Sequence, residues 1–334
     1  MALDTSNPEI QFAMDAARQA GLLVRDIQRE LVTPAITKED RSPVTVADFA
    51  AQAVVGAMMD RAFPGDPLVG EESAAALRAA EGREALETVT RFVGRTLAYA
   101  TPETVCAWVD RGAGAPETPG GRFWTVDPID GTKGFLRGEQ YAVALALVAD
   151  GAVRVGALAC PNLADAGAEA IGGPGSLVIA ARGQGTWTTP LDGEGALTPL
   201  RVSETADMRQ ARVLRSVEAG HTNVDQMSAL MAQLGVAAEP ARLDSQAKYA
   251  LLASGAGDLL LRLLSPSKPD YREMIWDQAA GSIVVEEAGG VVTDLDGRTL
   301  DFSAGRTLAH NRGVVASNGA LHKAILAGLK EAAA

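Results

Sequence analysis

The stretch WTVDPIDGTKGF, residues 124–135, joins a short apolar strand to two aspartates that lie three positions apart. We expect the strand, 123–126, to hold Asp127 and the following turn to bring Asp130 beside it. Adjacent carboxylates repel each other and do not both stay ionised without a cation. Gly131 lets the backbone wrap around a ligand, and a helix that begins here would offer N–H groups to an anion. A lone pair at this spacing is also typical of an acidic turn that caps a helix.

Three further acidic motifs occur along the chain. They are Asp48 within SPVTVADFAAQ (42–52), the acidic pair in VGEES (69–73), and Asp277 in WDQAAG (276–281). Each is ambiguous by itself, because a surface acid, a solvated helix start or an N-cap explains it equally well. Their joint occurrence in this order, together with the two aspartates above, indicates that acidic side chains gather in one site.

The apolar pattern changes near residue 198. Before this point, helical spacing predicts helices over 7–31 and 46–62, and the Ala-, Glu- and Arg-rich segment 74–121 predicts a helical lid or insertion. We expect residues 1–198 to form an α+β subdomain with an antiparallel sheet, and residues 199–334, where strands and helices alternate, to form an α/β subdomain. The individual predictions are strands at 141–149 and 152–159, joined by an Asp-Gly hairpin, and at 177–181, 185–188, 212–217, 257–263, 291–293 and 313–317, with helices at 223–234, 246–254, 277–288 and 319–332.

Charge and cysteine content exclude several classes of protein. The formal net charge is −12, so the chain gains no counterion-release free energy on a nucleic acid polymer, and an anionic substrate needs local cations or a metal ion. Cys106 and Cys160 give neither a disulfide framework nor zinc-ligand spacing, which favours the cytoplasm. Residues 1–20 lack a signal-peptide pattern, and no apolar stretch approaches the length of a membrane span, so we expect no membrane partner.

With these motifs in place, the sequence resembles the lithium-sensitive, magnesium-dependent phosphatases that include inositol monophosphatase and fructose-1,6-bisphosphatase. Within that superfamily the longer match is to the 3′(2′),5′-bisphosphate nucleotidases, and it extends over most of the chain outside roughly 74–121 and 163–200. The stretches that carry it are SPVTVADFAAQ (42–52), VGEES (69–73), DPIDGTKGFLRGEQYAVALALV (127–148), CPN (160–162), SVEAGH (216–221), LDSQAKYALLA (243–253), LRL (261–263) and WDQAAG (276–281).

The resemblance implies a layered αβαβα sandwich that binds two or three Mg²⁺ ions. The implied metal ligands are Glu71, Asp127, the backbone carbonyl of Ile129, Asp130 and Asp277. They are hard oxygen donors, as Mg²⁺ prefers, and Asp48 with Glu71 would hold a weaker third ion. Thr132 would orient the attacking water, with Asp48 or Glu71 as the proton acceptor. No Cys, His or Ser occupies a nucleophile position, so the resemblance implies direct attack by water.

The resemblance also implies residues that hold the substrate. They are Gly131, Thr132, His221, Ser245, Lys248, Arg262 and Asp277. Lys248 and Arg262 are cations in an acidic chain and suit the phosphate that is not cleaved. By themselves, Lys248 also fits a solvated helix face, Arg262 an inter-strand ion pair and His221 a loop residue. Lys133 and Arg137 either add to the field around the phosphate or are solvated loop charges.

Three hypotheses follow from these residues. The first is a phosphatase that converts adenosine 3′,5′-bisphosphate (PAP) to AMP and phosphate, with 3′-phosphoadenylyl sulfate (PAPS) as a related substrate, in sulfur assimilation and PAP clearance. The second is an inositol polyphosphate 1-phosphatase or inositol monophosphatase on the same scaffold. The third is a binding or sensor protein that kept the fold without catalysis. We expect the protein to act as a monomer or a homodimer.

Overall fold

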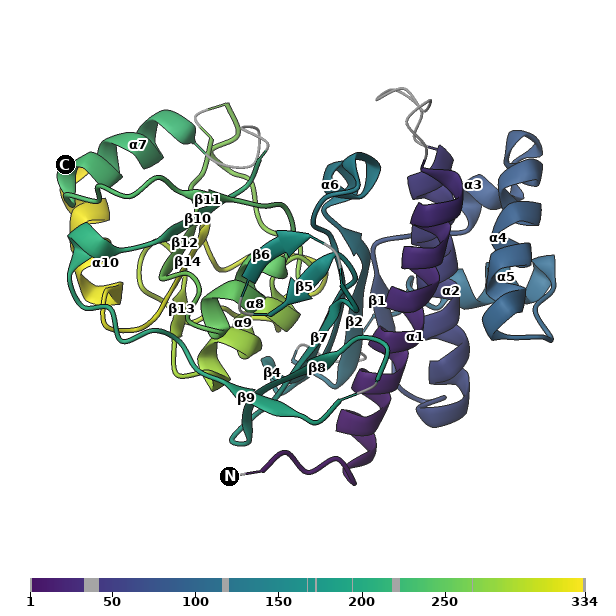
Figure 1. The fold of residues 1–334 in the computed structure, drawn as a ribbon. Helices are drawn as coiled ribbons and strands as arrows, with labels where there is room; N and C mark the ends of the chain where they lie inside the picture. The colour runs from purple at the N-terminus through teal and green to yellow at the C-terminus, as the bar shows by residue number, and fades with distance from the viewer. Residues whose placement is uncertain are drawn as a thin grey trace.

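The computed structural model describes residues 2–32, 42–115, 120–166, 168–171, 173–193, 195–217, 223–265 and 267–332. Helices and sheets alternate in layers: paired helices, a large sheet, a second helix pair, a smaller sheet and an outer helix pair (Figure 1). The predicted αβαβα sandwich is therefore confirmed.

The first helical layer consists of α1 (Pro8–Leu31) and α2 (Ser42–Ala62). The side chain of Asn7 caps α1 by accepting hydrogen bonds from the backbone N–H groups of Glu9, at 2.8 Å, and Ile10, at 3.3 Å. Apolar residues at helical spacing place one face of α1 in the core against α2 and the large sheet. Predicted helices 7–31 and 46–62 are both present, and the second begins four residues earlier than expected.

Residues 74–110 form a short helical array on the outer side of α2 (Figure 1). Its elements are α3 (Ala75–Arg78), η1 (Ala80–Gly82), α4 (Arg83–Thr96) and α5 (Pro102–Asp110). Helices α4 and α5 pack on α2, and no residue of the array lines the pocket described below. The description of this segment as a lid or an insertion stays a prediction.

The large sheet has the strand order β1-β2-β3-β4-β7-β8-β9. Its strands are β1 (Leu68–Gly70), β2 (Phe123–Asp130), β3 (Ala142–Ala149), β4 (Ala152–Cys160), β7 (Ser176–Ala181), β8 (Gly185–Pro190) and β9 (Thr198–Leu200). The predicted hairpin is present, and both Asp150 (φ 54°) and Gly151 (φ 69°) have the left-handed conformation that such turns require. The expectation of a purely antiparallel sheet is wrong at one edge, because the α3–α5 crossover lets β1 pair with β2 in parallel.

The smaller sheet has the order β11-β10-β12-β14-β13. Its strands are β10 (Val213–Arg215), β11 (Ala241–Arg242), β12 (Leu259–Arg262), β13 (Val291–Thr293) and β14 (Val314–Ser317). Helices α7 (Val224–Gln233) and α10 (His322–Ala332) pack on its outer face. A separate two-stranded ribbon pairs β5 (Leu163–Asp165) with β6 (Ala168–Ile171), and η2 (Met208–Gln210) precedes β10.

Helices α8 (Ala247–Ala253) and α9 (Ala279–Glu287) form the middle layer between the two sheets. Small residues allow this close packing: a Cβ atom built on Gly281 would lie 2.3 Å from the ring of Tyr249. The predicted division at residue 198 falls at the start of β9, the last strand of the large sheet, and before β10, the first strand of the smaller one. The division of the chain into two subdomains stays a prediction, because helices α8 and α9 of the middle layer are buried against both sheets.

Candidate active site

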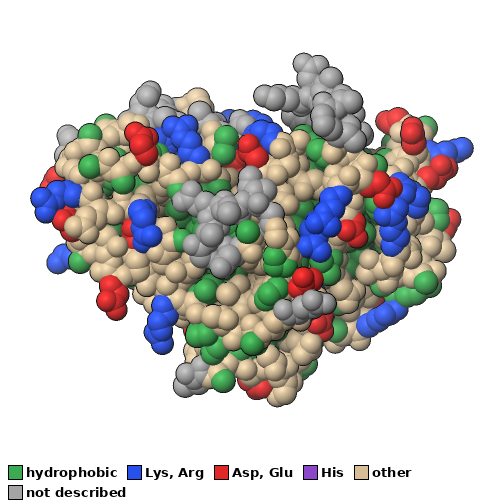
Figure 2. Space-filling model, viewed as in Figure 1, with side chains coloured by type: hydrophobic (Ala, Val, Ile, Leu, Met, Phe, Trp, Pro, Cys, Tyr) green, Lys and Arg blue, Asp and Glu red, His purple; other side chains and the backbone are tan. Residues whose placement is uncertain are grey.

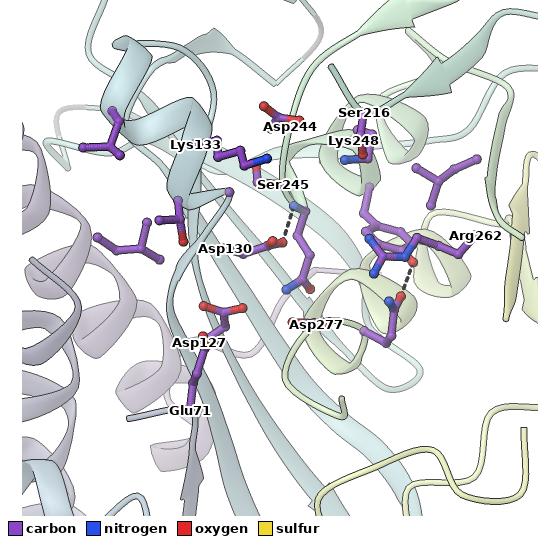
Figure 3. Close-up of a pocket in the computed structure, with 18 of the residues that line it drawn as sticks. Glu71, Asp127, Asp130, Lys133, Ser216, Asp244, Ser245, Lys248, Arg262 and Asp277 are labelled. Atoms are coloured by element: carbon purple, nitrogen blue, oxygen red, sulfur yellow. Dashed lines mark hydrogen bonds between the residues drawn. The ribbon is translucent and has the colours of Figure 1, made fainter. Parts of the chain in front are cut away.

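A pocket of about 430 Å³ lies between the end of β2 and the smaller sheet (Figure 3). On one side are Glu71, Asp127 and Asp130, which we call the acidic side. On the other are Lys248 from α8 and Arg262 from β12, which we call the cationic side. The pocket therefore brings together residues from Glu71 to Gln278, and the charges of the five residues named above are divided between its two sides.

A β-bulge at the end of β2 explains why both aspartates face the pocket. The predicted strand 123–126 in fact continues to Asp130, and its pairing with β3 shifts register between Asp127 and Asp130. In a regular strand these two side chains would point to opposite faces, and one extra residue turns them to the same face. Pro128 and Ile129 fall within the bulge, and Ile129 lines the pocket. The expected turn is thus a bulge within the strand.

The acidic side contains carboxylates that lack compensating partners. Asp127 is buried, and its Oδ1 atom has no hydrogen-bond partner in the protein. Burial, followed by the negative charges of Glu71 and Asp130, raises the pKa of Asp127 well above its usual value. Glu71 extends from the end of β1 and keeps contact with solvent, yet partial burial and the charges of Glu72 and Asp130 raise its pKa to about 7.

Two further predicted acids contribute to this field. Asp277 lies in the turn before α9 and lines the pocket; burial, then the charge of Asp130, raises its pKa to about 8. The N-cap of α9 is Gln278 and it makes no side-chain capping bond, so the N-cap explanation of Asp277 is wrong. Asp48, on α2, does not line the pocket, but it is close enough to add to the raised pKa of Asp127. Its own pKa is raised by burial and by Glu72 and Glu71.

The turn after β2 lies against the start of α8. Gly131 has a φ of +91°, and a Cβ atom placed on it would lie 2.8 Å from the Cβ atom of Ser245. Ser245 itself has a φ of +71°, a conformation that is uncommon for a residue other than glycine. The backbone N–H of Gln246 donates to Oδ2 of Asp130 at 2.6 Å. Helix α6 (Thr132–Arg137) begins directly after Gly131, as expected, and exposes Thr132 and Lys133 to the pocket.

Lys248 is the buried cation of the cationic side. Its side chain is only 4% exposed, and its Nζ atom donates to the carbonyl oxygen of Leu243 at 3.3 Å. Burial lowers the pKa of Lys248 to about 8, although the charge of Asp130 acts in the opposite direction. The alternative explanation of Lys248 as part of a solvated helix face is therefore wrong.

Arg262 lines the pocket but is already paired. Its Nη2 atom lies 2.7 Å from Oε2 of Glu273, a buried carboxylate that also accepts from the side chain of Gln278 at 2.9 Å. Arg262 is therefore ion-paired, but the prediction of an inter-strand pair is wrong, because Glu273 lies in a loop and not on a neighbouring strand. Glu273 was not predicted as a site residue, because it lies in none of the sequence motifs.

Most predicted site residues meet at this pocket. Those that line it are Glu71, Asp127, Ile129, Asp130, Gly131, Thr132, Ser245, Lys248, Arg262 and Asp277. Asp48 lies behind the acidic side, and His221 falls outside the described residues. Asp244 and Tyr271 are among the lining residues that were not assigned a role from the sequence. Asp244 directly precedes Ser245 in the motif LDSQAKY, and this position is the sequence feature that could have identified it as a site residue.

The acidic side suits a hard divalent cation. Its donor atoms are oxygens, and one of them, the buried Oδ1 of Asp127, lacks a partner. The negative charge of each carboxylate raises the pKa values of its neighbours. Within the described ranges, no three His, Cys, Asp or Glu side chains are already arranged to hold a metal ion. The residues therefore fit Mg²⁺ by the chemistry of their donor atoms.

Comparison with known proteins agrees with this site. The sequence pattern of the inositol monophosphatase family matches residues 6–334. The chain belongs to the inositol monophosphatase family. Dependence on Mg²⁺ is general among these phosphatases. The predicted superfamily and enzyme class are therefore confirmed.

Curated members of the family resemble the chain over nearly its whole length. A 3′(2′),5′-bisphosphate nucleotidase from Schizosaccharomyces pombe is 41% identical, covering 92% of this chain and 91% of the relative. One from Emericella nidulans is also 41% identical, with 95% and 96% covered, and one from Oryza sativa is 39% identical, with 99% and 97% covered. These names agree with the branch that the sequence motifs indicated.

Solved structures confirm the fold. An inositol monophosphatase from Zymomonas mobilis superimposes with a TM-score of 0.63 at 20% identity, covering 98% of this chain and 99% of that one. An enzyme of the same kind from Thermotoga maritima gives 0.62 at 21% identity, covering 97% and 98%. No described helix is both long and apolar enough to cross a membrane. Figure 2 shows cationic and anionic side chains interspersed on the visible face, with no broad basic patch there.

Proposed function

We propose that the chain is a magnesium-dependent 3′(2′),5′-bisphosphate nucleotidase that removes the 3′-phosphate of PAP to give AMP and phosphate. The observation that carries this proposal is the division of charge across one pocket. Carboxylates for metal ions stand on one side, and a buried lysine with an arginine stands on the other. A substrate with two phosphate groups fits this division, because one group can face the metal ions while the other faces the cations.

The acidic side would hold the metal. The proposed ligands are Glu71, Asp127, the carbonyl oxygen of Ile129, Asp130 and Asp277. Two or three Mg²⁺ ions bound there would neutralise the phosphate charge and lower the pKa of water. The chain supplies the proton acceptor, and the candidates are the carboxylates of Asp48 and Glu71. The hydroxyl of Thr132, at the pocket edge, orients the attacking water.

The cationic side would hold the phosphate that is not cleaved. Arg262 is already partly neutralised by Glu273, so Lys248 contributes the larger share of the attraction. Ser245 and His221 would contact the nucleoside, while Gly131, Thr132 and Asp277 would lie against the phosphate that is cleaved. A position in sulfur assimilation and PAP clearance, and a cytoplasmic location, follow from this substrate and from the cysteine content as further predictions.

A phosphate-release assay tests the proposal. We expect turnover of PAP in Mg²⁺ that EDTA abolishes and that lithium inhibits, with PAPS as a second substrate. Inositol 1,4-bisphosphate and inositol 1-phosphate serve as the comparison, since they represent the other activity considered on this scaffold. Faster turnover of the inositol phosphates than of PAP would contradict the proposal, and nucleotide binding without turnover in Mg²⁺ would indicate a sensor protein.

A further inference from the structure

Arg137 forms an ion pair that crosses from one side of the pocket to the other. It ends α6, directly after the turn that carries Asp130, and its guanidinium contacts the carboxylate of Asp244. Asp244 lies 107 residues further along the chain, in the loop before α8, with a side chain only 7% exposed. The sequence interpretation of Arg137 as a solvated charge is therefore wrong, because it binds the opposite side of the pocket.

Asp244 also holds the end of β10. Its Oδ1 atom accepts a hydrogen bond from the backbone N–H of Val217 at 3.1 Å, two residues after the strand ends. One carboxylate thus joins α6 to the end of a strand of the smaller sheet. Figure 3 shows Asp244 above Ser245 and close to Lys248, between the acidic and the cationic sides.

A second connection lies beside the first. The backbone N–H of Gln246 donates to Oδ2 of Asp130 at 2.6 Å. Asp244 and Gln246, which flank Ser245, are therefore bonded to Arg137 and Asp130, across the pocket. Ser245 keeps its positive φ of 71° between these two attachments. A strained backbone of this kind persists only where its surroundings fix it, and it is common at ligand sites. The spacing of the two sides is therefore fixed at residues 244–246.

We propose that Arg137 is a positioning residue that, through Asp244, sets the separation between the acidic and cationic sides and thereby the affinity for a substrate with two phosphate groups. This inference rests on the proposed function. A substrate that engages both sides at once depends on their separation, because the second contact is favourable only where the geometry matches. A substrate with one phosphate engages the acidic side and depends on the separation far less.

The test compares two substitutions on the same helix end. Arg137→Gln removes the pair that crosses the pocket. Glu139→Gln is the matched control, because the Nε atom of Arg137 also pairs with Oε2 of Glu139, at 2.6 Å, on its own side. For Arg137→Gln we expect the KM for PAP to rise about tenfold, the KM for adenosine 3′-monophosphate to change less than about twofold, and kcat to stay nearly constant. Glu139→Gln should change each constant less than about twofold.

Calorimetric titration in Mg²⁺ with a non-hydrolysable phosphonate analogue of PAP provides a readout without turnover, because Mg²⁺ lets the acidic side take part in binding. Arg137→Gln should weaken binding by the same factor as it raises KM, whereas a residue with a merely structural role would lower the melting temperature and leave the ratio between the two substrates unchanged. Equal KM changes for both substrates, or matching effects of the two substitutions, would overturn the positioning role while leaving the proposed function intact. Failure of the unsubstituted chain to turn over either nucleotide would overturn both.

Discussion

The two sides of the pocket hold their charges in different ways. On the acidic side, burial and like charge raise the pKa values of Asp127 and Glu71, and one oxygen of Asp127 has no partner. On the cationic side, Arg262 is neutralised by Glu273, and Lys248 donates to a backbone carbonyl. The acidic side is therefore incomplete without an added cation. The cationic side is largely satisfied within the protein, and Lys248 provides most of its attraction for an anion.

The strongest test of this comparison removes one charge from the acidic side. In Asp130→Asn, the new side chain keeps its size and can still accept from Gln246, but it is a poor metal ligand. We expect kcat/KM for PAP to fall by roughly a thousandfold or more, because charge stabilisation at the phosphate is lost. Asp15→Asn, at an exposed ion pair on α1, is the control. Retention of most activity in Asp130→Asn would contradict its assignment as a ligand.

The next test removes the unneutralised cation from the other side. Lys248→Met keeps the length of the side chain without its charge, so the KM for PAP should rise on the order of 10- to 100-fold, with a smaller change for adenosine 3′-monophosphate. Lys268→Met, an exposed lysine in the loop before α9, provides the control. Because a buried ammonium is lost, the melting temperature should not fall. Equal KM changes for the two substrates would show that Lys248 does not bind the second phosphate.

Arg262 should behave differently, because its charge already has a partner. Arg262→Ala leaves the buried carboxylate of Glu273 unpaired, and we expect the free energy of unfolding to decrease by about 3 kcal/mol. Urea denaturation measures this change. Arg298→Ala breaks an exposed pair with Asp296, 3.8 Å apart, and should lower stability by less than about 1 kcal/mol. If the two substitutions had equal effects, the Arg262–Glu273 pair would not stabilise the fold as its burial indicates.

The smallest effect concerns pH and Mg²⁺. Folding raises the pKa of Glu71 to about 7 and the pKa of Asp277 to about 8. At pH values between the usual pKa of each carboxyl group and its raised pKa, the folded chain therefore binds more protons than the unfolded chain. Stability in EDTA should therefore fall as the pH rises from 5 to 8. Mg²⁺ should raise the melting temperature, most strongly at pH 8, because it binds the ionised carboxylates. Differential scanning calorimetry measures both; stability in EDTA that increased over this range would contradict the prediction.

Local sequence patterns predicted most of the elements and the membership of the site. Periodicity located the helices, the Asp150–Gly151 turn located the hairpin, and the ordered acidic motifs indicated the family, which is confirmed. The bulge between Asp127 and Asp130 was not predicted, because a shift of register depends on the pairing with β3 and not on the residues of β2 alone. The same limit explains why β1 was not expected to pair in parallel.

The partners of the site residues were the least predictable part. Gln246 and Asp130 lie 116 residues apart, and Arg137 and Asp244 lie 107 apart, so no local spacing relates them. Glu273 is closer in sequence to Arg262, yet the loop between them follows no periodic pattern. Motifs thus identified which residues carry the chemistry. The contacts that orient those residues depend on how the two sheets are brought together.

The lack of a side chain on Gly131 limits how substrate preference can change among members of this family. Any substitution there would place a carbon atom 2.8 Å from the Cβ atom of Ser245 and would also have to adopt a φ of +91°. Even alanine would force the strand end and the serine facing it apart. New substrate preferences are therefore expected to arise through the outer loops of the pocket and not at this position.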